Sequence, residues 1–349
     1  MSGTLLIWGA GAIGGTIGAS LVRAGQDVLF VDSAVDHVAA MQRDGLAIEG
    51  PIQQFVVPVR AATPAQLEGR YDRILLCVKA HHTADAARAL LPYLSPAGYV
   101  ASFQNGLNEP VIGAVTGMQR VVGAFVNFGA DYLEPGRILF GGRGACVVGE
   151  VDGSASERVS ALRRTLLPFE PDTIGTDDIL GYLWGKVAYG ALLFATAVTD
   201  DAIADILASE TYRAVLVGVG REAMAVAVAI AQGVQPRGFN GFDPAAFAPG
   251  GNAAAIDASF DAMVAFNRRS AKSHSGIWRD LAIRHRQTEV DAQLGPVVAG
   301  GAACGIETKL TVRLIELIHE IERGERRLDR ANLDVLTPRA LRPAGLEVR

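Results

Sequence analysis

The sequence predicts an α/β fold, with a doubly wound parallel sheet in the N-terminal half and an all-α domain after it. Three apolar runs of strand length, at 4–8, 28–31 and 74–78, are separated by segments with helical periodicity. Strands that alternate with helices in this way form parallel βαβ units. After about residue 177 the strand patterns stop and long helical patterns follow.

The first helix and the later strands follow from the same periodicities. Ile13, Ile17 and Leu21 recur at i, i+4 and i+8, which predicts a helix directly after the first strand. Four more strand-like runs follow, at 99–103, 121–126, 138–140 and 145–149. The later runs have hairpin-like spacing and glycines between them. We therefore expect the sheet to end with antiparallel strands near residue 150.

Two long helical patterns, 209–232 and 308–322, dominate the C-terminal half. The segment 235–252 between them is rich in Gly, Pro and Phe, which predicts a long loop. The segment 322–330 (ERGERRLDR) carries several arginines. Because acids are interleaved with them, a solvated helix end is favoured over a basic contact surface.

Composition and charge exclude several classes of partner and site. The 349 residues are 50% hydrophobic, enough for two domains, and the net charge of −5 comes with scattered Lys and Arg. This distribution predicts neither a nucleic-acid nor a membrane partner. Cys77, Cys146 and Cys304 are too far apart for a disulfide framework or a CxxC site, so we expect buried thiols. The histidines have no metal-ligand spacing, and we predict no metal. Without a basic signal region or a membrane-length apolar run, the expected location is cytoplasmic.

A glycine pattern after the first strand predicts a dinucleotide site. Gly9 permits a tight turn, Gly11 lets the backbone approach a pyrophosphate, and Gly14 allows close packing of helix on strand. The N–H groups at the start of the helix, at Ala12 and Ile13, would face the anion. The alternative is a glycine-rich turn that binds no ligand.

Asp32 ends the second strand, 32 − 9 = 23 residues beyond the first glycine of the pattern. A carboxylate there can accept hydrogen bonds from the adenosine ribose and would repel a 2′-phosphate. The alternative, an aspartate that caps the next helix, is compatible with this role. FAD proteins share the glycine pattern, but no second flavin signature follows. We therefore expect NAD(H) to be preferred over NADP(H).

Four further motifs come in a distinctive order: CVKA at 77–80, QNG at 104–106, WGK at 184–186 and RHRQTEVD at 284–291. Together with the glycine pattern they resemble the ketopantoate reductase family (2-dehydropantoate 2-reductase and related D-2-hydroxyacid dehydrogenases), from about residue 4 to about residue 325. The resemblance implies hydride transfer from a nicotinamide to the C2 carbonyl of a 2-oxo acid. The product would be an (R)-2-hydroxy acid.

The resemblance also implies roles for four residues. Lys186 would polarise the carbonyl and protonate the developing alkoxide. Glu289 matches a carboxylate near the cofactor and the lysine, which would keep Lys186 charged and oriented. Asn105 matches an asparagine that reaches both nicotinamide and substrate, and Lys79 a lysine that binds the cofactor. Lys186 and Glu289 could instead be ordinary helix-surface residues, and Asn105 part of a turn that binds no ligand.

One departure from the family concerns the substrate. The family carries asparagines four and eight residues after the catalytic lysine, where this chain has Gly190 and Phe194. The position of a third family asparagine, ten residues farther along, is occupied here by Ala204. Ser275 is the nearest match to a family serine, about two positions out of register. We therefore expect ketopantoate to be a poor substrate. Gly190 would open room near the lysine and Phe194 would form an apolar wall, which suits a bulkier, branched or aromatic 2-oxo acid. Asn105 and Ser275 would hold its polar end. The alternative is that other residues replace the asparagines.

Taken with the resemblance, these patterns divide the chain into a Rossmann-type dinucleotide-binding domain (1–176), a helical substrate-binding and catalytic domain (177–335) and a flexible tail (336–349). The expected partner is a small 2-oxo or 2-hydroxy acid. The oligomeric state is left open, with a homodimer as the candidate. Two other interpretations are a relative of the β-hydroxyacid and 6-phosphogluconate dehydrogenases, whose glycine-rich substrate motif is missing here, and a non-catalytic NAD-binding module.

Overall fold

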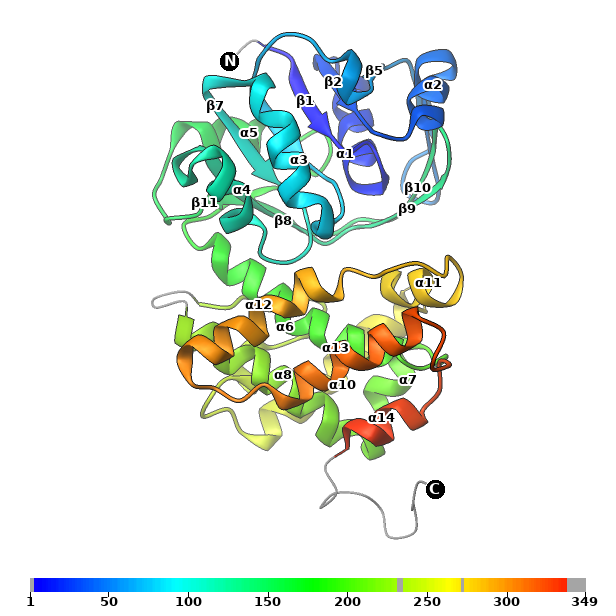
Figure 1. Cartoon of the computed structure of the whole chain (residues 1–349), viewed down its shortest axis with the longest axis vertical. Helices are drawn as coiled ribbons and strands as arrows, with labels where there is room; N and C mark the ends of the chain where they lie inside the picture. Colours follow the sequence, from blue (N-terminus) through cyan, green and yellow to red (C-terminus); the bar gives the residue numbers. More distant parts are fainter. Residues whose placement is uncertain (1–2, 231–234, 271–272, 338–349) are drawn as a thin grey trace. The chain divides into compact units, whose positions relative to one another are not determined.

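The computed structural model describes residues 3–230, 235–270 and 273–337 (Figure 1). The chain divides into two compact units, Met1–Ile179 and Leu180–Arg349. The predicted boundary after residue 176 lies three residues before this division. Of the predicted tail, Leu336 ends a helix and is only 2% exposed, whereas residues 338–349 lie outside the described residues.

The N-terminal unit contains an eight-stranded sheet in the order β12-β11-β8-β7-β6-β1-β2-β5. The pairs from β8 to β5 are all parallel, β11 is antiparallel to β8, and β12 is parallel to β11. The predicted doubly wound sheet and its antiparallel end near residue 150 are therefore confirmed. The strands are β1 (Leu5–Trp8), β2 (Val28–Val31), β5 (Arg60–Ala62), β6 (Tyr71–Leu76), β7 (Leu94–Ser102), β8 (Val121–Val126), β11 (Cys146–Glu150) and β12 (Ile174–Gly175).

Both faces of this sheet are covered, which explains why β1 is apolar at every position. Leu5 and Ile7 belong to one core cluster, whereas Leu6 and Trp8 belong to another, because successive side chains point to opposite faces. Residues of α1 and α5 complete the first cluster, and residues of α3 and α4 the second. The helices are α1 (Ala12–Arg23), α2 (Val35–Asp44), α3 (Thr83–Leu90), α4 (Glu109–Thr116) and α5 (Glu157–Leu166), with short 3-10 turns at 64–66, 80–82, 91–93 and 118–120.

A second sheet of four strands was not predicted. Its order is β4-β3-β10-β9, and it consists of β3 (Leu46–Glu49), β4 (Phe55–Val57), β9 (Gly129–Glu134) and β10 (Arg137–Gly142). The expectation that 138–140 extends the main sheet is wrong, since Ile138 pairs with Ile48 of β3 and with Tyr132 of β9. Short strands that pair with a partner about 90 residues away leave no local periodicity that identifies the partner.

The described part of the C-terminal unit is helical apart from one isolated bridge, Phe239 with Phe242. The predicted helical patterns 209–232 and 308–322 become α8 and α13, and the predicted loop 235–252 contains only the short α9. The helices are α6 (Ile179–Ala197), α7 (Ile203–Ala208), α8 (Glu210–Ile230), α9 (Pro244–Phe247), α10 (Ala253–Arg269), α11 (Gly276–Ala282), α12 (Val290–Cys304), α13 (Lys309–Glu322) and α14 (Ala331–Leu336).

Helix α6 is long and apolar enough to cross a membrane by composition alone. However, 72% of its most apolar 18-residue stretch is buried inside the structure. We therefore interpret α6 as a buried helix in the core of the C-terminal unit.

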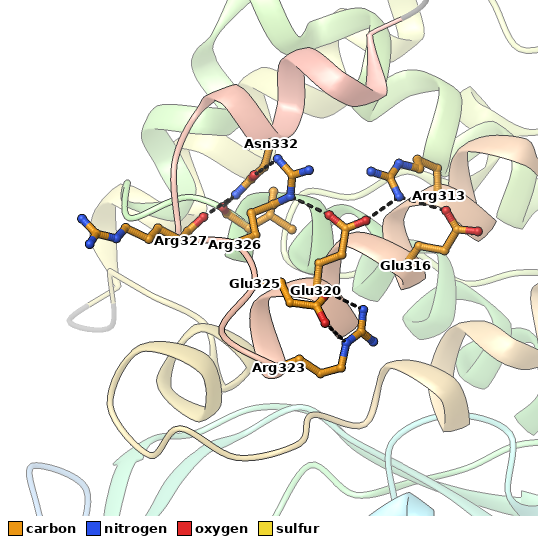
Figure 2. A network of polar contacts seen from close by, with 9 residues as sticks. Arg313, Glu316, Glu320, Arg323, Glu325, Arg326, Arg327 and Asn332 are labelled. Carbon is orange, nitrogen blue, oxygen red and sulfur yellow. Dashed lines mark hydrogen bonds and ion pairs between the residues drawn. The ribbon is translucent and has the colours of Figure 1, made fainter.

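The arginine-rich segment 322–330 forms a network with the end of α13 (Figure 2). Glu320 accepts hydrogen bonds from Arg313 and Arg326, both at 2.7 Å. Arg326 also donates to Asn332 Oδ1 at 3.2 Å, and Asn332 donates to the Val198 carbonyl at 2.7 Å. The acids therefore neutralise neighbouring arginines and secure the turn into α14, which confirms that this segment is a helix end.

Candidate functional site

The glycine turn after β1 is built to leave backbone N–H groups open. Gly9 has φ +99°, and a Cβ there would lie 2.9 Å from the backbone nitrogen of Val78. In contrast, a Cβ on Gly11 would meet nothing within 4 Å. Helix α1 has no side-chain cap, and its first backbone bond runs from Gly15 N–H to the Gly11 carbonyl. The N–H groups of Ala12 and Ile13 thus stay outside the helical ladder, as an anion-binding helix start requires.

Asp32 braces this glycine turn. Its Oδ2 accepts the Ala10 N–H at 2.8 Å, and its Oδ1 accepts the Ala34 N–H at 2.9 Å, at the start of α2. The carboxylate is partly exposed, and each of its oxygens retains acceptor capacity. It therefore places a negative charge beside the turn that would hold a pyrophosphate.

His37 is a buried residue of α2 that the sequence did not single out. Gly136 N–H donates to its Nδ1 at 2.9 Å, so its Nε2 carries the proton and donates to the Ala10 carbonyl at 2.9 Å. Ala10 is thus held through its N–H by Asp32 and through its carbonyl by His37. The signal in the sequence was weak, because His37 shares the buried face of α2 with Met41.

A buried polar network joins the two loops that carry Lys79 and Asn105. Gln104 Nε2 donates to the Val78 carbonyl at 3.0 Å and to the Thr83 hydroxyl at 2.8 Å. Asn108 lies 2.9 Å from the same hydroxyl and donates to the Asn105 carbonyl at 2.7 Å. Lys79 is exposed and Asn105 is partly exposed. Both residues therefore lie on hydrogen-bonded loops at the carboxyl ends of β6 and β7, the edge where doubly wound sheets bind ligands.

Glu109, the first residue of α4, lies beside this network and was also missed. It is 1% exposed, and its Oε2 makes no hydrogen bond to the described residues. Burial raises the pKa of this carboxyl to about 7. The Glu109 carboxyl is therefore partly protonated at neutral pH.

In the C-terminal unit, α6 positions Lys186 through the two residues before it. Trp184 is 4% exposed and anchors the helix in the core. A Cβ on Gly185 would lie 2.1 Å from the Arg237 carbonyl oxygen, and Arg237 N–H donates to the Gly181 carbonyl at 2.9 Å. The Trp-Gly-Lys motif thus combines an anchor with a close backbone approach, and it leaves Lys186 partly buried.

The charge of Lys186 is set by its surroundings. Burial lowers the pKa of its ammonium from the usual 10.5 to about 8, and the Glu289 carboxylate opposes this shift. Glu289 is 7% exposed and precedes α12. Its neighbour Thr288 is fixed to α13, because the Thr288 N–H donates to Glu322 Oε1 at 2.7 Å. The structure therefore brings together two of the predicted site residues, about 100 positions apart in the chain.

Ser275 and the arginines near Glu289 have structural partners. Ser275 caps α11 by accepting the Trp278 N–H at 3.1 Å, which leaves its own proton available for donation. Arg284 and Arg286 donate to the buried Asp280 at 3.1 and 2.9 Å. The arginines of this motif therefore stabilise the turn before Glu289.

At the positions that depart from the family, the expectation for Phe194 is not supported. Phe194 has no exposed surface and packs in the helical core, so it forms no open wall. Ala204 lies on α7 and is 8% exposed. Gly190 is different, since a Cβ there would meet Gln293 Oε1 at 3.6 Å. Gln293 is thus the residue beside the lost asparagine position, and it could have been found from its place one turn after Glu289.

The cysteines differ in exposure, which corrects the expectation of three buried thiols. Cys146 is buried and burial raises its pKa to about 12, but Cys304 is exposed at the end of α12. Across the described ranges, no group of three His, Cys, Asp or Glu side chains could hold a metal ion.

Comparisons with known proteins cover most of the chain. Residues 5–153 match the family model of ketopantoate reductase PanE/ApbA, and residues 178–322 match the model of its C-terminal domain. A 2-dehydropantoate 2-reductase of Mesorhizobium japonicum is 31% identical over 245 residues, which is 64% of this chain and 75% of that relative.

Solved structures agree with these matches. A PanE/ApbA family ketopantoate reductase from Ralstonia eutropha JMP134 is 27% identical with a TM-score of 0.77, covering 93% of this chain and 99% of that one. D-mandelate dehydrogenase, solved with NADH and anilino(oxo)acetate, has a TM-score of 0.80 at 20% identity and covers 92% and 99%, which shows a shared fold. The chain therefore belongs to the ketopantoate reductase family and is an oxidoreductase of the NAD(P)-dependent dehydrogenase and reductase class.

Proposed function

We propose that this protein reduces a 2-oxo acid to an (R)-2-hydroxy acid with a nicotinamide cofactor, and that Lys186 is the proton donor. The observation that carries the proposal is the partly buried Lys186 beside Glu289, with a pKa of about 8. An ammonium with this pKa is mostly protonated at neutral pH and can still release its proton to a developing alkoxide.

The proposal assigns cofactor binding to the N-terminal unit. The open N–H groups of Ala12 and Ile13 and the space beside Gly11 fit a pyrophosphate, and Asp32 suits the ribose hydroxyls. Lys79 and Asn105 lie on the loops that would hold the rest of the dinucleotide. When bound, the cofactor supplies the hydride. Because Asp32 is anionic, NADH is the proposed cofactor in preference to NADPH.

Lys186 and Glu289 supply the proton chemistry. As C2 of the substrate gains the hydride, the electron pair of the C=O bond moves to oxygen, which takes a proton from Lys186 Nζ. The ammonium stabilises the oxyanion before it transfers the proton. Glu289 favours the protonated form of the lysine and thus promotes its recharging from solvent.

The substrate is proposed to differ from ketopantoate. Gly190 has no polar side chain to offer beside Lys186, and Phe194 has no exposed surface. The shared fold with D-mandelate dehydrogenase supports including aryl 2-oxo acids among the candidates. A homodimer and a cytoplasmic location stay predictions.

Initial-rate assays test the function. Oxidation of NADH and NADPH is measured at 340 nm with ketopantoate, 2-oxoisovalerate, phenylpyruvate and benzoylformate. We expect turnover of at least one acid, with NADH ahead of NADPH and ketopantoate not ahead of the other three. NADH binding without turnover of any acid would instead identify a non-catalytic NAD-binding module.

A further inference from the structure

Residues of α6 and α12 lie near each other at two places in the C-terminal unit, one helical turn apart. At the first, the Glu289 carboxylate acts on the charge of Lys186. At the second, one turn later on each helix, Gln293 lies against Gly190. Gln293 N–H donates to the Glu289 carbonyl at 2.9 Å, so Glu289 and Gln293 share one face of α12. The side chain of Gln293 therefore lies in line with the Lys186–Glu289 pair.

Gly190 provides the space that Gln293 occupies. A Cβ on Gly190 would lie 3.6 Å from Gln293 Oε1, and apart from the adjoining residues and backbone of α6 itself no other atom of the described chain comes within 4 Å of it. The Gln293 side chain is partly buried, and its carboxamide makes no hydrogen bond to the described residues. A carboxamide has two donors and an acceptor, and partly buried groups of this kind are normally paired with protein, water or a ligand.

We propose that Gln293 binds the carboxylate of the 2-oxo acid, a deepening of the function proposed above on which it rests. The substrate carboxylate accepts hydrogen bonds only, which matches the NH₂ group of the carboxamide. The Glu289 carboxylate repels a second anion. Gln293 is uncharged and lies one turn from Glu289. It therefore holds the substrate carboxylate away from Glu289, while the C2 oxygen of the substrate faces Lys186.

In this arrangement, the polar contact with the substrate comes from α12 and not from α6. Position 190 on α6 provides no side chain, and position 293 on α12 provides the carboxamide. The two positions should therefore be exchangeable: an asparagine at 190 can enter the space that a shortened residue at 293 leaves empty. Such an exchange would recover binding only if the carboxamide itself is what the substrate needs.

The first experiment measures KM and kcat for Gln293→Ala and Gln293→Glu, with the exposed Gln54→Ala as the matched control. Ketopantoate and trimethylpyruvate form the test pair, because they differ only in one hydroxyl. Loss of a hydrogen bond to a charged group should raise KM for both acids by about 10- to 100-fold with a smaller change in kcat. Gln293→Glu should be worse than Gln293→Ala, because the new charge repels the carboxylate.

A binding measurement separates this proposal from the proposed function. Calorimetric titration of the NADH-loaded protein with oxamate, an unreactive analogue that keeps the carboxylate, needs no turnover. We expect weaker oxamate binding in both Gln293 variants and a partial recovery in Gly190→Asn/Gln293→Ala. Equal oxamate affinity in wild type and variants would overturn the proposal, as would a loss of rate confined to ketopantoate. Wild type that binds oxamate but reduces no acid would refute the function and not the role of Gln293.

Discussion

The two halves of the candidate machinery are built by different means. In the N-terminal unit, the site is made of backbone: N–H groups at the start of α1, held in place because Asp32 and His37 bind the two sides of Ala10. In the C-terminal unit, it is made of side chains from two helices, with Lys186 partly buried against Glu289. We therefore expect the backbone site to tolerate the loss of one supporting residue, and the side-chain site to lose its chemistry when a single residue is replaced.

The largest expected effect is that of Lys186→Ala. Without the proton donor the alkoxide is uncompensated, and general acid catalysis typically contributes about 10²- to 10⁴-fold to kcat. NADH affinity, measured by fluorescence titration, should change little. Lys309→Ala is the control, because Lys309 is an exposed lysine paired with Glu307. A kcat for Lys186→Ala within about threefold of wild type would exclude Lys186 as the acid.

The pH dependence of reduction tests the charge of the same lysine. Its pKa is lowered to about 8, so the protonated, active form prevails below pH 8 and is lost as the pH rises through that value. We expect kcat/KM for reduction to fall about tenfold per pH unit above the break. Glu289→Gln removes the carboxylate that raises this pKa, so the break should move to lower pH. An unchanged break in that variant would mean that Glu289 does not act on Lys186.

The preference for NADH over NADPH should depend on the negative charge of Asp32 and not on its hydrogen bond to Ala10. Asp32→Asn keeps an oxygen for the Ala10 N–H but removes the charge that repels a 2′-phosphate. We expect the ratio of kcat/KM for NADPH over NADH to rise about tenfold or more, which is modest for a unit charge at close range. The ratio is measured at low ionic strength, where screening is weak. If it does not move, Asp32 only braces the turn.

The smallest effect is expected at His37. His37→Ala removes two buried hydrogen bonds, each worth about 1 kcal/mol, so thermal stability should fall. Asp32 still holds the other side of Ala10, and KM for NADH should therefore rise only a few-fold while kcat stays near wild type. A loss as large as that of Lys186→Ala would show that the glycine turn depends on both braces.

The sequence alone determined the parts whose causes lie close together in the chain. The glycine turn, its helix and Asp32 fall within about 30 residues, so strand and helix periodicity and the glycine spacing were enough to predict them. The doubly wound sheet followed from the alternation of strand and helix patterns, and the helical half from long 3.6-residue periodicity. Lys186 and Glu289 followed from short motifs that resemble a known family.

Only the tertiary structure decided which faces meet. Periodicity shows that a residue lies on a buried face, but not which distant element covers that face. It therefore could not reveal that β10 leaves the main sheet to pair with β3, or that Phe194 is sealed in the core. For the same reason, the contact between Gly190 and Gln293 became visible only after α6 and α12 had packed together, because their helical patterns are independent of each other.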